Sequence, residues 1–139
     1  MNLNLIYPMA AMVVLTFGVA CKMFLTRVAA VKGGEASAGF YKTYQEGSEP
    51  RQAAQLSRHF SNLFETPTLF YTACVIGMVT GFYANILVGL AWLYVACRLL
   101  HAIVHIGANK IPNRIRSFFL SLAVLLGMWG TLVVGVAGG

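Results

Sequence analysis

The chain has 139 residues, of which 58% are hydrophobic and only 10% are charged, and its net charge is +6. Soluble domains carry about 25% charged residues, so the composition excludes an ordinary soluble globular domain. The length predicts a single domain over residues 1–139. Long apolar stretches indicate an integral membrane protein that crosses the membrane several times.

Four stretches are long enough to cross a membrane, which takes about 20 apolar residues in a helix. In chain order they cover residues 5–31, 53–82, 84–106 and 117–136. A transmembrane barrel needs alternating apolar and polar residues, whereas these stretches are continuously apolar. Because the connection at 83–85 is very short, the second and third helices are expected to form an antiparallel hairpin. The predicted fold is an all-α, up-and-down bundle of four transmembrane helices.

The first stretch is expected to be a retained helix rather than a signal peptide. A signal peptide has a basic region before its apolar core. Residues 1–7 carry no charge here, and the basic residues Lys22 and Arg27 follow the apolar run instead.

The second helix contains Gly77 and Gly81 at GxxxG spacing, which suits a close contact between helices.

The basic residues predict the orientation, because Lys and Arg concentrate on the cytoplasmic side. All ten lie in or beside the first and third connections: Lys22, Arg27, Lys32, Lys42, Arg51, Arg58, Arg98, Lys110, Arg114 and Arg116. Both termini are therefore expected on the non-cytoplasmic side of a bacterial inner membrane or an endomembrane. The cytoplasmic charge also suits membrane lipid or an anionic substrate as a partner. Nucleic acid is not an expected partner, since no soluble basic surface is predicted.

The three cysteines and two of the histidines are candidate ligands of a metal or haem. Cys21, Cys74 and Cys97 lie far apart in different apolar stretches and form no CxxC pattern, so they are interpreted as small packing residues. His101 and His105 have the i, i+4 spacing of a metal-binding or haem-binding pair. They lack a third ligand, and Arg98 lies one turn away, so no metal site is predicted.

Two polar stripes occur inside the apolar stretches. The stripe on the second helix, at spacing i, i+4, i+7, consists of Arg58, Asn62 and Glu65. The stripe on the third helix, at spacing i, i+3, i+7, consists of Arg98, His101 and His105. In an up-and-down bundle both stripes lie at the cytoplasmic end. Such a cluster indicates a site, because ionisable groups in membrane spans are costly; the alternative is that the long side chains snorkel to the headgroups.

The stretch RHFSNLFETP resembles the helix-two signature of the MAPEG family, the membrane-associated proteins in eicosanoid and glutathione metabolism. That signature has an Arg, an Asn four residues later, a Glu three residues after that, and then a Pro; the matching residues are Arg58, Asn62, Glu65 and Pro67. The stretch CRLLHAIVHIGANKIPNRIRSF resembles the microsomal prostaglandin E synthase branch of the family. Its matching residues are Arg98, His101, Pro112, Arg116 and Ser117. The resemblance covers nearly the whole chain, as in a short, prokaryote-like member.

The resemblance implies a homotrimer that holds glutathione between neighbouring subunits near the cytoplasmic face, beside a lipophilic second substrate. Residues that would bind the charged groups of glutathione are Arg27, Arg58, Asn62, Glu65, Arg98 and His101, with Glu65 meeting its amino group. Arg116 and Ser117 would lie near the thiol.

Two positions depart from the family pattern. A Tyr usually stands seven residues after the helix-three Arg, where this chain has His105, and a second Arg often precedes the Asn, where it has Ser61. His105 remains a candidate catalytic residue because it can hydrogen-bond a thiolate.

Three functional hypotheses stay open. The first is a glutathione-dependent transferase or peroxidase acting on lipophilic electrophiles. The second is a non-catalytic accessory or lipid-binding subunit of a larger membrane complex. The third is a haem or quinone anchor that uses His101 and His105.

Overall fold

The computed structural model describes residues 3–45, 47–81 and 85–138. Its elements are the 3-10 helix η1 (Leu3–Leu5) and the helices α1 (Ile6–Lys32), α2 (Phe40–Thr43), α3 (Arg51–Asn62), α4 (Thr66–Val79), α5 (Asn85–Ile106) and α6 (Ile111–Ala137). No strand occurs in these ranges. The predicted all-α class is therefore confirmed.

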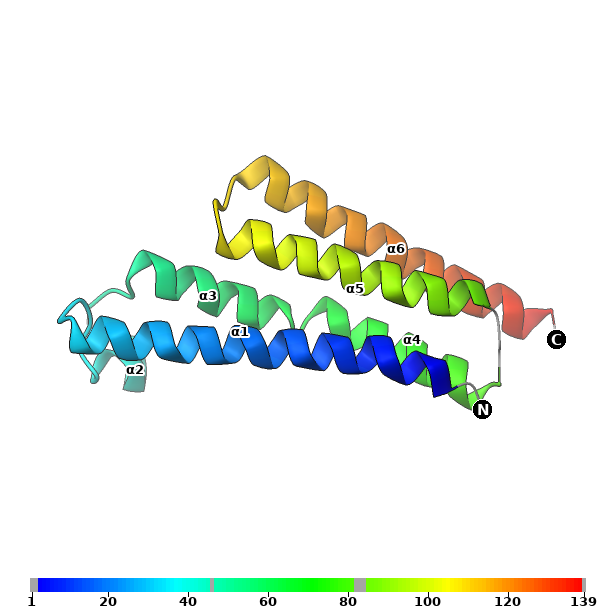
Figure 1. Ribbon diagram of the computed structural model, residues 1–139, viewed down its shortest axis with the longest axis horizontal. Coiled ribbons are helices and arrows are strands. Elements are labelled where there is room, and N and C mark those ends of the chain that lie inside the picture. The colour runs from blue at the N-terminus through cyan, green and yellow to red at the C-terminus, as the bar shows by residue number, and fades with distance from the viewer. Residues whose placement is uncertain (1–2, 46, 82–84, 139) are drawn as a thin grey trace.

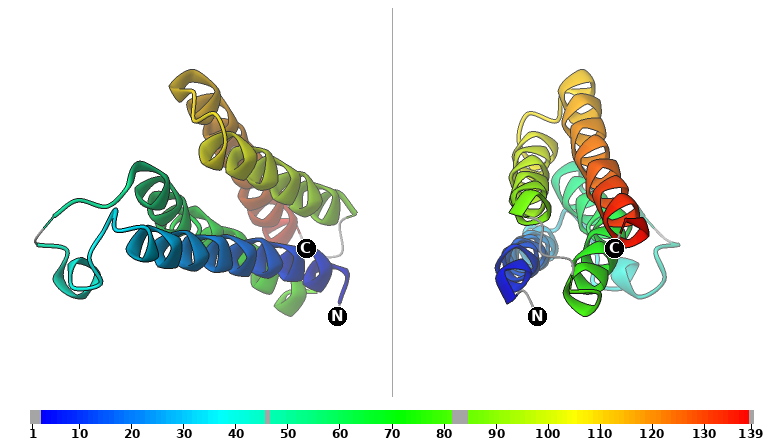
Figure 2. Two further views of the ribbon diagram at one scale, coloured as in Figure 1. Left: turned by 60° about the vertical axis from the view of Figure 1, so that its left-hand side comes forward. Right: turned by 90° about the vertical axis from the view of Figure 1, so that its right-hand side faces the viewer.

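The helices form a bundle that is wider at one end. Helices α3 and α4 follow one another alongside α1, while α5 and α6 form a hairpin packed across them (Figure 1). The start of α1 and the end of α6 lie at one end of the bundle, and the α5–α6 connection lies toward the other. The hairpin diverges from α1 toward that connection (Figure 2). The polar residues of α3, α5 and α6 therefore lie where the bundle opens.

The apolar core lies nearer the start of α1. The rings of Phe70 and Tyr94 stack there with centroids 4.6 Å apart, and both side chains are fully buried. Gly77 of α4 allows close helix packing, since a Cβ at this position would lie 2.7 Å from the side chain of Leu87 and 3.3 Å from that of Leu5. The close contact suggested by the GxxxG spacing is thus made at Gly77, within one chain.

In the described part of the chain, three helices are long and apolar enough to cross a membrane, over Leu3–Lys32, Asn85–Ile106 and Ile111–Gly135. Their outer faces carry large exposed apolar side chains, among them Val14, Phe24, Ile103, Leu126 and Val133. A water-soluble chain would bury such side chains, whereas lipid accepts them. The predicted multi-pass membrane character agrees with this surface.

The second predicted stretch, 53–82, is not one helix. It consists of α3 and α4, separated by a turn at residues 63–65 in which the Phe64 N–H donates to the Ser61 carbonyl at 3.0 Å. Pro67 explains the break, because it has no N–H to continue the helical hydrogen-bond pattern and fits the first turn of a new helix. Residues 82–84, which include most of the predicted hairpin connection at 83–85, lie outside the described residues.

The last helix begins earlier than predicted. The sequence placed its start at residue 117, but α6 begins at Ile111, with Pro112 in its first turn. Proline is well accommodated at this position, because the first N–H groups of a helix have no partner within it. Arg114 and Arg116 therefore project from a helix rather than from a loop.

Candidate functional site

Helix α5 brings the predicted stripe of Arg98, His101 and His105 into the bundle interior. Their exposed fractions are 0%, 3% and 7%, so these three side chains are buried and do not snorkel to the surface. The spacing i, i+3, i+7 places them on one helix face. That face is covered because α5 packs against α6 and α3.

Arg98 is held by Asn62 across the α3–α5 contact. Its guanidinium Nη2 donates to the Asn62 side-chain oxygen at 2.5 Å and to the Asn62 carbonyl at 3.5 Å. The buried Nε and Nη1 of Arg98 have no hydrogen-bond partner among the described residues. The two polar stripes were predicted to lie close together, and they meet at Arg98 and Asn62.

His101 is oriented by the start of α6. Its Nδ1 lies 3.0 Å from the Ser117 hydroxyl, and that hydroxyl donates to the Arg114 carbonyl at 3.1 Å. The Ser117 hydroxyl thus bridges the His101 Nδ1 and the Arg114 carbonyl, and it anchors the His101 ring to the start of α6.

His59 of α3 belongs to the same layer, and the sequence interpretation missed it. Its ring centroid lies 5.0 Å from that of His105 and 5.5 Å from that of His101. It is fully buried, and neither ring nitrogen has a partner among the described residues. The available signal was its position three residues before Asn62, on the same helix face. In the described part of the chain, these histidines do not form a metal-binding arrangement with one another or with Cys, Asp or Glu.

Two adjoining pockets open beside this layer. The first, of about 240 Å³, is lined by Arg58, Asn62, His101, His105 and Arg114 together with apolar side chains of α6. The second, of about 290 Å³, shares Arg58, His105 and Arg114 with it and adds Arg51, Gln55 and Asn109. Among the described residues, no acidic side chain lines either pocket. Their walls are therefore suited to an anion.

Gln55 ties the second pocket to the end of α5. Its side-chain amide donates to the His105 carbonyl and, at 3.5 Å, to the Gly107 carbonyl. These are carbonyls at the end of a helix, which lack intrahelical partners. These hydrogen bonds hold the backbone of His105 in place beside α3.

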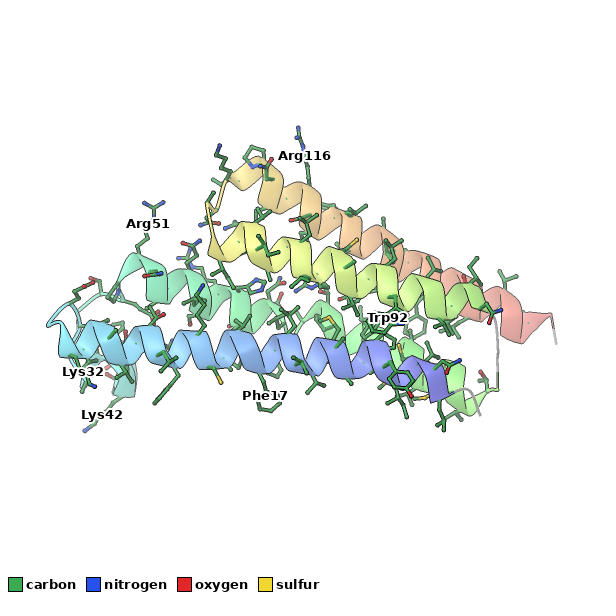
Figure 3. All side chains as sticks on the ribbon, viewed as in Figure 1. Phe17, Lys32, Lys42, Arg51, Trp92 and Arg116 are labelled. Atoms are coloured by element: carbon green, nitrogen blue, oxygen red, sulfur yellow. The ribbon has the colours of Figure 1, made fainter. Side chains whose placement is uncertain are left out.

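Arg114, rather than the predicted Arg116, lines the pockets. Arg114 is half-buried and also donates to the Asn109 side chain at 3.3 Å. Arg116 is exposed and points away from the bundle in Figure 3. The two residues lie about 200° apart around a helix of 3.6 residues per turn, so the earlier start of α6 decides which arginine faces inward.

Glu65 does not join Arg58 and Asn62 at the pockets. It lies in the α3–α4 turn and is exposed, and its carboxylate makes no ion pair with any described residue. The turn interrupts the helical spacing, so the predicted i, i+7 relation to Arg58 is lost. No ion pair joins Glu65 to Arg58 or Arg98, the cationic partners expected for it from the sequence.

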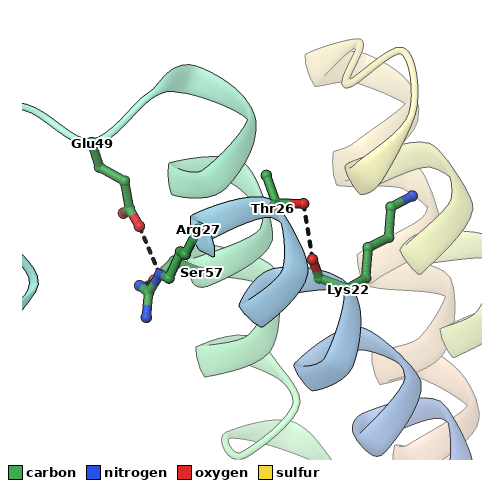
Figure 4. Close-up of polar contacts among 5 residues, drawn as sticks. All are labelled: Lys22, Thr26, Arg27, Glu49 and Ser57. Atoms are coloured by element: carbon green, nitrogen blue, oxygen red, sulfur yellow. Dashed lines mark hydrogen bonds and ion pairs between the residues drawn. The ribbon is translucent and has the colours of Figure 1, made fainter. Parts of the chain in front are cut away.

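Arg27 also lies outside the pockets, bound by the first connection (Figure 4). Its Nε pairs with Glu49 at 2.9 Å, and its Nη2 donates to the Ser57 hydroxyl at 3.0 Å. The rings of Tyr41 and Tyr44 lie 5.1 Å and 5.8 Å from its guanidinium carbon. Burial, with a contribution from the Glu49 carboxylate, raises the pKa of Tyr41 and keeps its phenol neutral. Arg27 here fastens the connection to α1.

The family model of the MAPEG family matches residues 5–134. The chain belongs to the MAPEG family. This confirms the predicted resemblance to the family as a whole. No curated protein matches the chain. MAPEG members include glutathione-dependent transferases and peroxidases, so the family and the three apolar helices together identify a multi-pass membrane protein from a family with such enzymes.

Proposed function

We propose that this protein is a glutathione-dependent transferase or peroxidase that acts on lipophilic electrophiles. The observation that carries the proposal is the pair of pockets lined by Arg58 and Arg114, with Arg98 buried beside them and no acidic residue among the described residues of their walls. A buried cation that forms no ion pair is costly, so an anion bound here stabilises the site. Glutathione, with two carboxylates and one ammonium group, supplies the required negative charge.

The pocket residues suit activation of a thiol. Arginine side chains near a thiol lower its pKa and favour the thiolate, which is the nucleophile. His105 lines both pockets and its buried Nδ1 has no partner among the described residues. Its other ring nitrogen, Nε2, can accept the thiol proton as the S–H bond breaks. The thiolate then attacks an electrophile that enters past the apolar α6 side chains Ile115, Phe118 and Phe119.

The proposed oligomer is a homotrimer in which a neighbouring subunit covers the α3–α4 turn. Glu65 is exposed at this turn, and Phe17 and Phe64 are 67% and 57% exposed beside an apolar pocket of about 400 Å³. A carboxylate facing lipid is costly, and a subunit interface removes it from lipid. At such an interface Glu65 can meet the ammonium group of glutathione bound by the neighbour.

In the proposed topology α3 and α4 together make one crossing. Helix α4 has 14 residues and spans about 21 Å, less than the ~30 Å hydrocarbon core. With α3 before it, the pair runs alongside α1. Four crossings place both termini on one side, and the basic first and third connections assign that side as non-cytoplasmic.

A non-catalytic membrane subunit of the same family is the second candidate. The observation that favours it is the placement of Arg116 and Glu65 outside the pockets, together with His105 where the family usually has Tyr. Such a subunit would use the Arg98–Asn62 and His101–Ser117 contacts for stability alone. It would co-purify with a stoichiometric partner and show no transferase activity.

Isothermal titration of the detergent-solubilised protein with reduced glutathione tests the proposal. We expect saturable binding that Arg98→Ala abolishes, that Arg58→Gln weakens about tenfold, and that Arg116→Gln leaves unchanged. Arg58 is exposed, so its variant reports on binding even where loss of buried Arg98 impairs folding. Absence of binding at millimolar glutathione would refute the proposal.

A further inference from the structure

A groove of about 660 Å³ lies between α1 and α5 and plays no part in the proposed chemistry. It is lined by α1 residues from 11 to 22, by α5 residues from 95 to 106, and by Gly107 just after α5. Every lining residue is aliphatic, alanine or glycine except Lys22. An apolar groove with a single cation at one end has the chemistry of a site for an anionic amphiphile.

We propose that this groove binds one acyl chain of an anionic phospholipid of the cytoplasmic leaflet, with the phosphate held by Lys22. The Lys22 side chain leaves α1 on the side of α5 and α6, away from Arg27 (Figure 4). It forms no ion pair, since the single ion pair found over residues 3–45, 47–81 and 85–138 joins Arg27 and Glu49. The phosphate supplies the negatively charged partner that Lys22 lacks among the described residues.

The length of the groove matches one leaflet. From Lys22 to Ala11 the α1 wall rises eleven residues, or about 16 Å at ~1.5 Å per residue. Half of the ~30 Å hydrocarbon core is ~15 Å, the depth reached by an acyl chain from one side. Lys22 lies beside Ile106 and Gly107 at the end of α5, next to the basic third connection. The headgroup therefore belongs to the cytoplasmic leaflet in the proposed topology.

The groove is on the opposite face of α1 from the proposed subunit interface. Its α1 residues Ala11, Gly18 and Lys22 share one face, whereas the apolar pocket beside the α3–α4 turn uses Val13 and Phe17 on the other. That the groove faces lipid rests on the homotrimer of the proposed function. A neighbour that covers the Glu65 side leaves the α1–α5 side facing lipid.

The test uses delipidated, detergent-purified protein mixed with phosphatidylglycerol or phosphatidylcholine of identical acyl chains, with bound lipid counted by native mass spectrometry. We expect about a fivefold preference for phosphatidylglycerol, the effect of one lysine near an anionic headgroup. Lys22→Gln should abolish the preference, whereas Lys42→Gln, at an exposed position on α2, should keep it. Equal retention of the two lipids by the wild type, or a preference that survives Lys22→Gln, would overturn the proposal.

Gly18→Leu supplies a second variant. A Cβ at Gly18 meets no atom within 4 Å, so leucine should fill the groove without displacing the helices and should reduce retention of both lipids. A change in oligomer size in this variant would instead assign the groove to a second copy of the chain and overturn the lipid proposal. Glutathione titration of the same variants separates the two proposals, since Lys22→Gln should keep the wild-type affinity for glutathione.

Discussion

Arg98 is fully buried, and its only described hydrogen-bond acceptors are the two oxygens of Asn62. Charged groups inside membrane proteins face the interior or a polar cavity and mark functional sites. Arg114 and Arg58 extend the same positive region into the two pockets. Ser117 and Gln55 act through the histidines, because Ser117 anchors the His101 ring and Gln55 binds the backbone carbonyl of His105.

Arg114 and Arg116 form a matched pair for a test of thiol activation. An arginine next to the glutathione sulfur lowers the thiol pKa. Arg114→Gln should therefore raise the thiol pKa of bound glutathione by about one unit, which reduces the thiolate fraction near neutral pH about tenfold. Ultraviolet absorbance of the thiolate, followed against pH, measures the shift. Arg116→Gln is the control, and an equal shift in this variant would place the thiol elsewhere.

For individual residues, the spacing in the sequence predicted the polar stripe of α5 but did not predict the whole site. Arg98, His101 and His105 share a helix face, which periodicity alone predicts. The choice between Arg114 and Arg116 depends on where α6 begins, and helix ends are poorly determined by local sequence. His59 was missed because a histidine beside Arg58 also fits an interfacial position.

At the scale of helices, the close approach of α4 to its neighbours depends on Gly77. Its missing side chain leaves space for Leu87 and Leu5, which a larger residue would displace. Pro67 has a comparable effect on the second predicted stretch, since it separates α3 from α4 and leaves Glu65 exposed in the turn between them. The proline was visible in the sequence, yet the continuous apolar composition of 53–82 favoured one helix.

Gly77→Val should destabilise the protein. The added Cβ would lie 2.7 Å from Leu87, and such overpacking typically costs about 1–3 kcal/mol. The same substitution at Gly130, where a Cβ meets nothing within 4 Å, should change the free energy of unfolding by less than about 0.5 kcal/mol. Thermal unfolding of the two variants in one detergent gives the comparison. Equal melting temperatures would show that α4 does not pack closely at Gly77.

At the scale of the whole molecule, the apolar surface and the distribution of charge determine how the protein lies in the membrane. Exposed apolar side chains cover the outer faces of α1, α5 and α6, and the basic residues lie toward the wider end of the bundle. Composition was sufficient to predict the membrane class, because no soluble fold accommodates so few charges. The proposed contacts between subunits could not be predicted from the sequence, because a single sequence does not show which surfaces of two copies meet.

The proposed orientation can be tested with single cysteines in a chain whose native cysteines are replaced by alanine. Gly138→Cys should react with a membrane-impermeant maleimide added to the non-cytoplasmic side. Lys42→Cys, in the basic first connection, should react only after the membrane is permeabilised, because positive residues stay in the cytoplasm. The reverse labelling pattern would invert the topology, and labelling of both sites from one side would exclude four crossings.

Glutathione is proposed to bind between α3, α5 and α6, beside Arg58, Arg98 and Arg114. An experimental density map of the detergent-solubilised protein with millimolar glutathione tests this placement. We expect tripeptide density in the two adjoining pockets, with a carboxylate within hydrogen-bond distance of Arg58 or Arg114. Density for glutathione at another place on the protein, or pockets that stay empty at saturating glutathione, would contradict it.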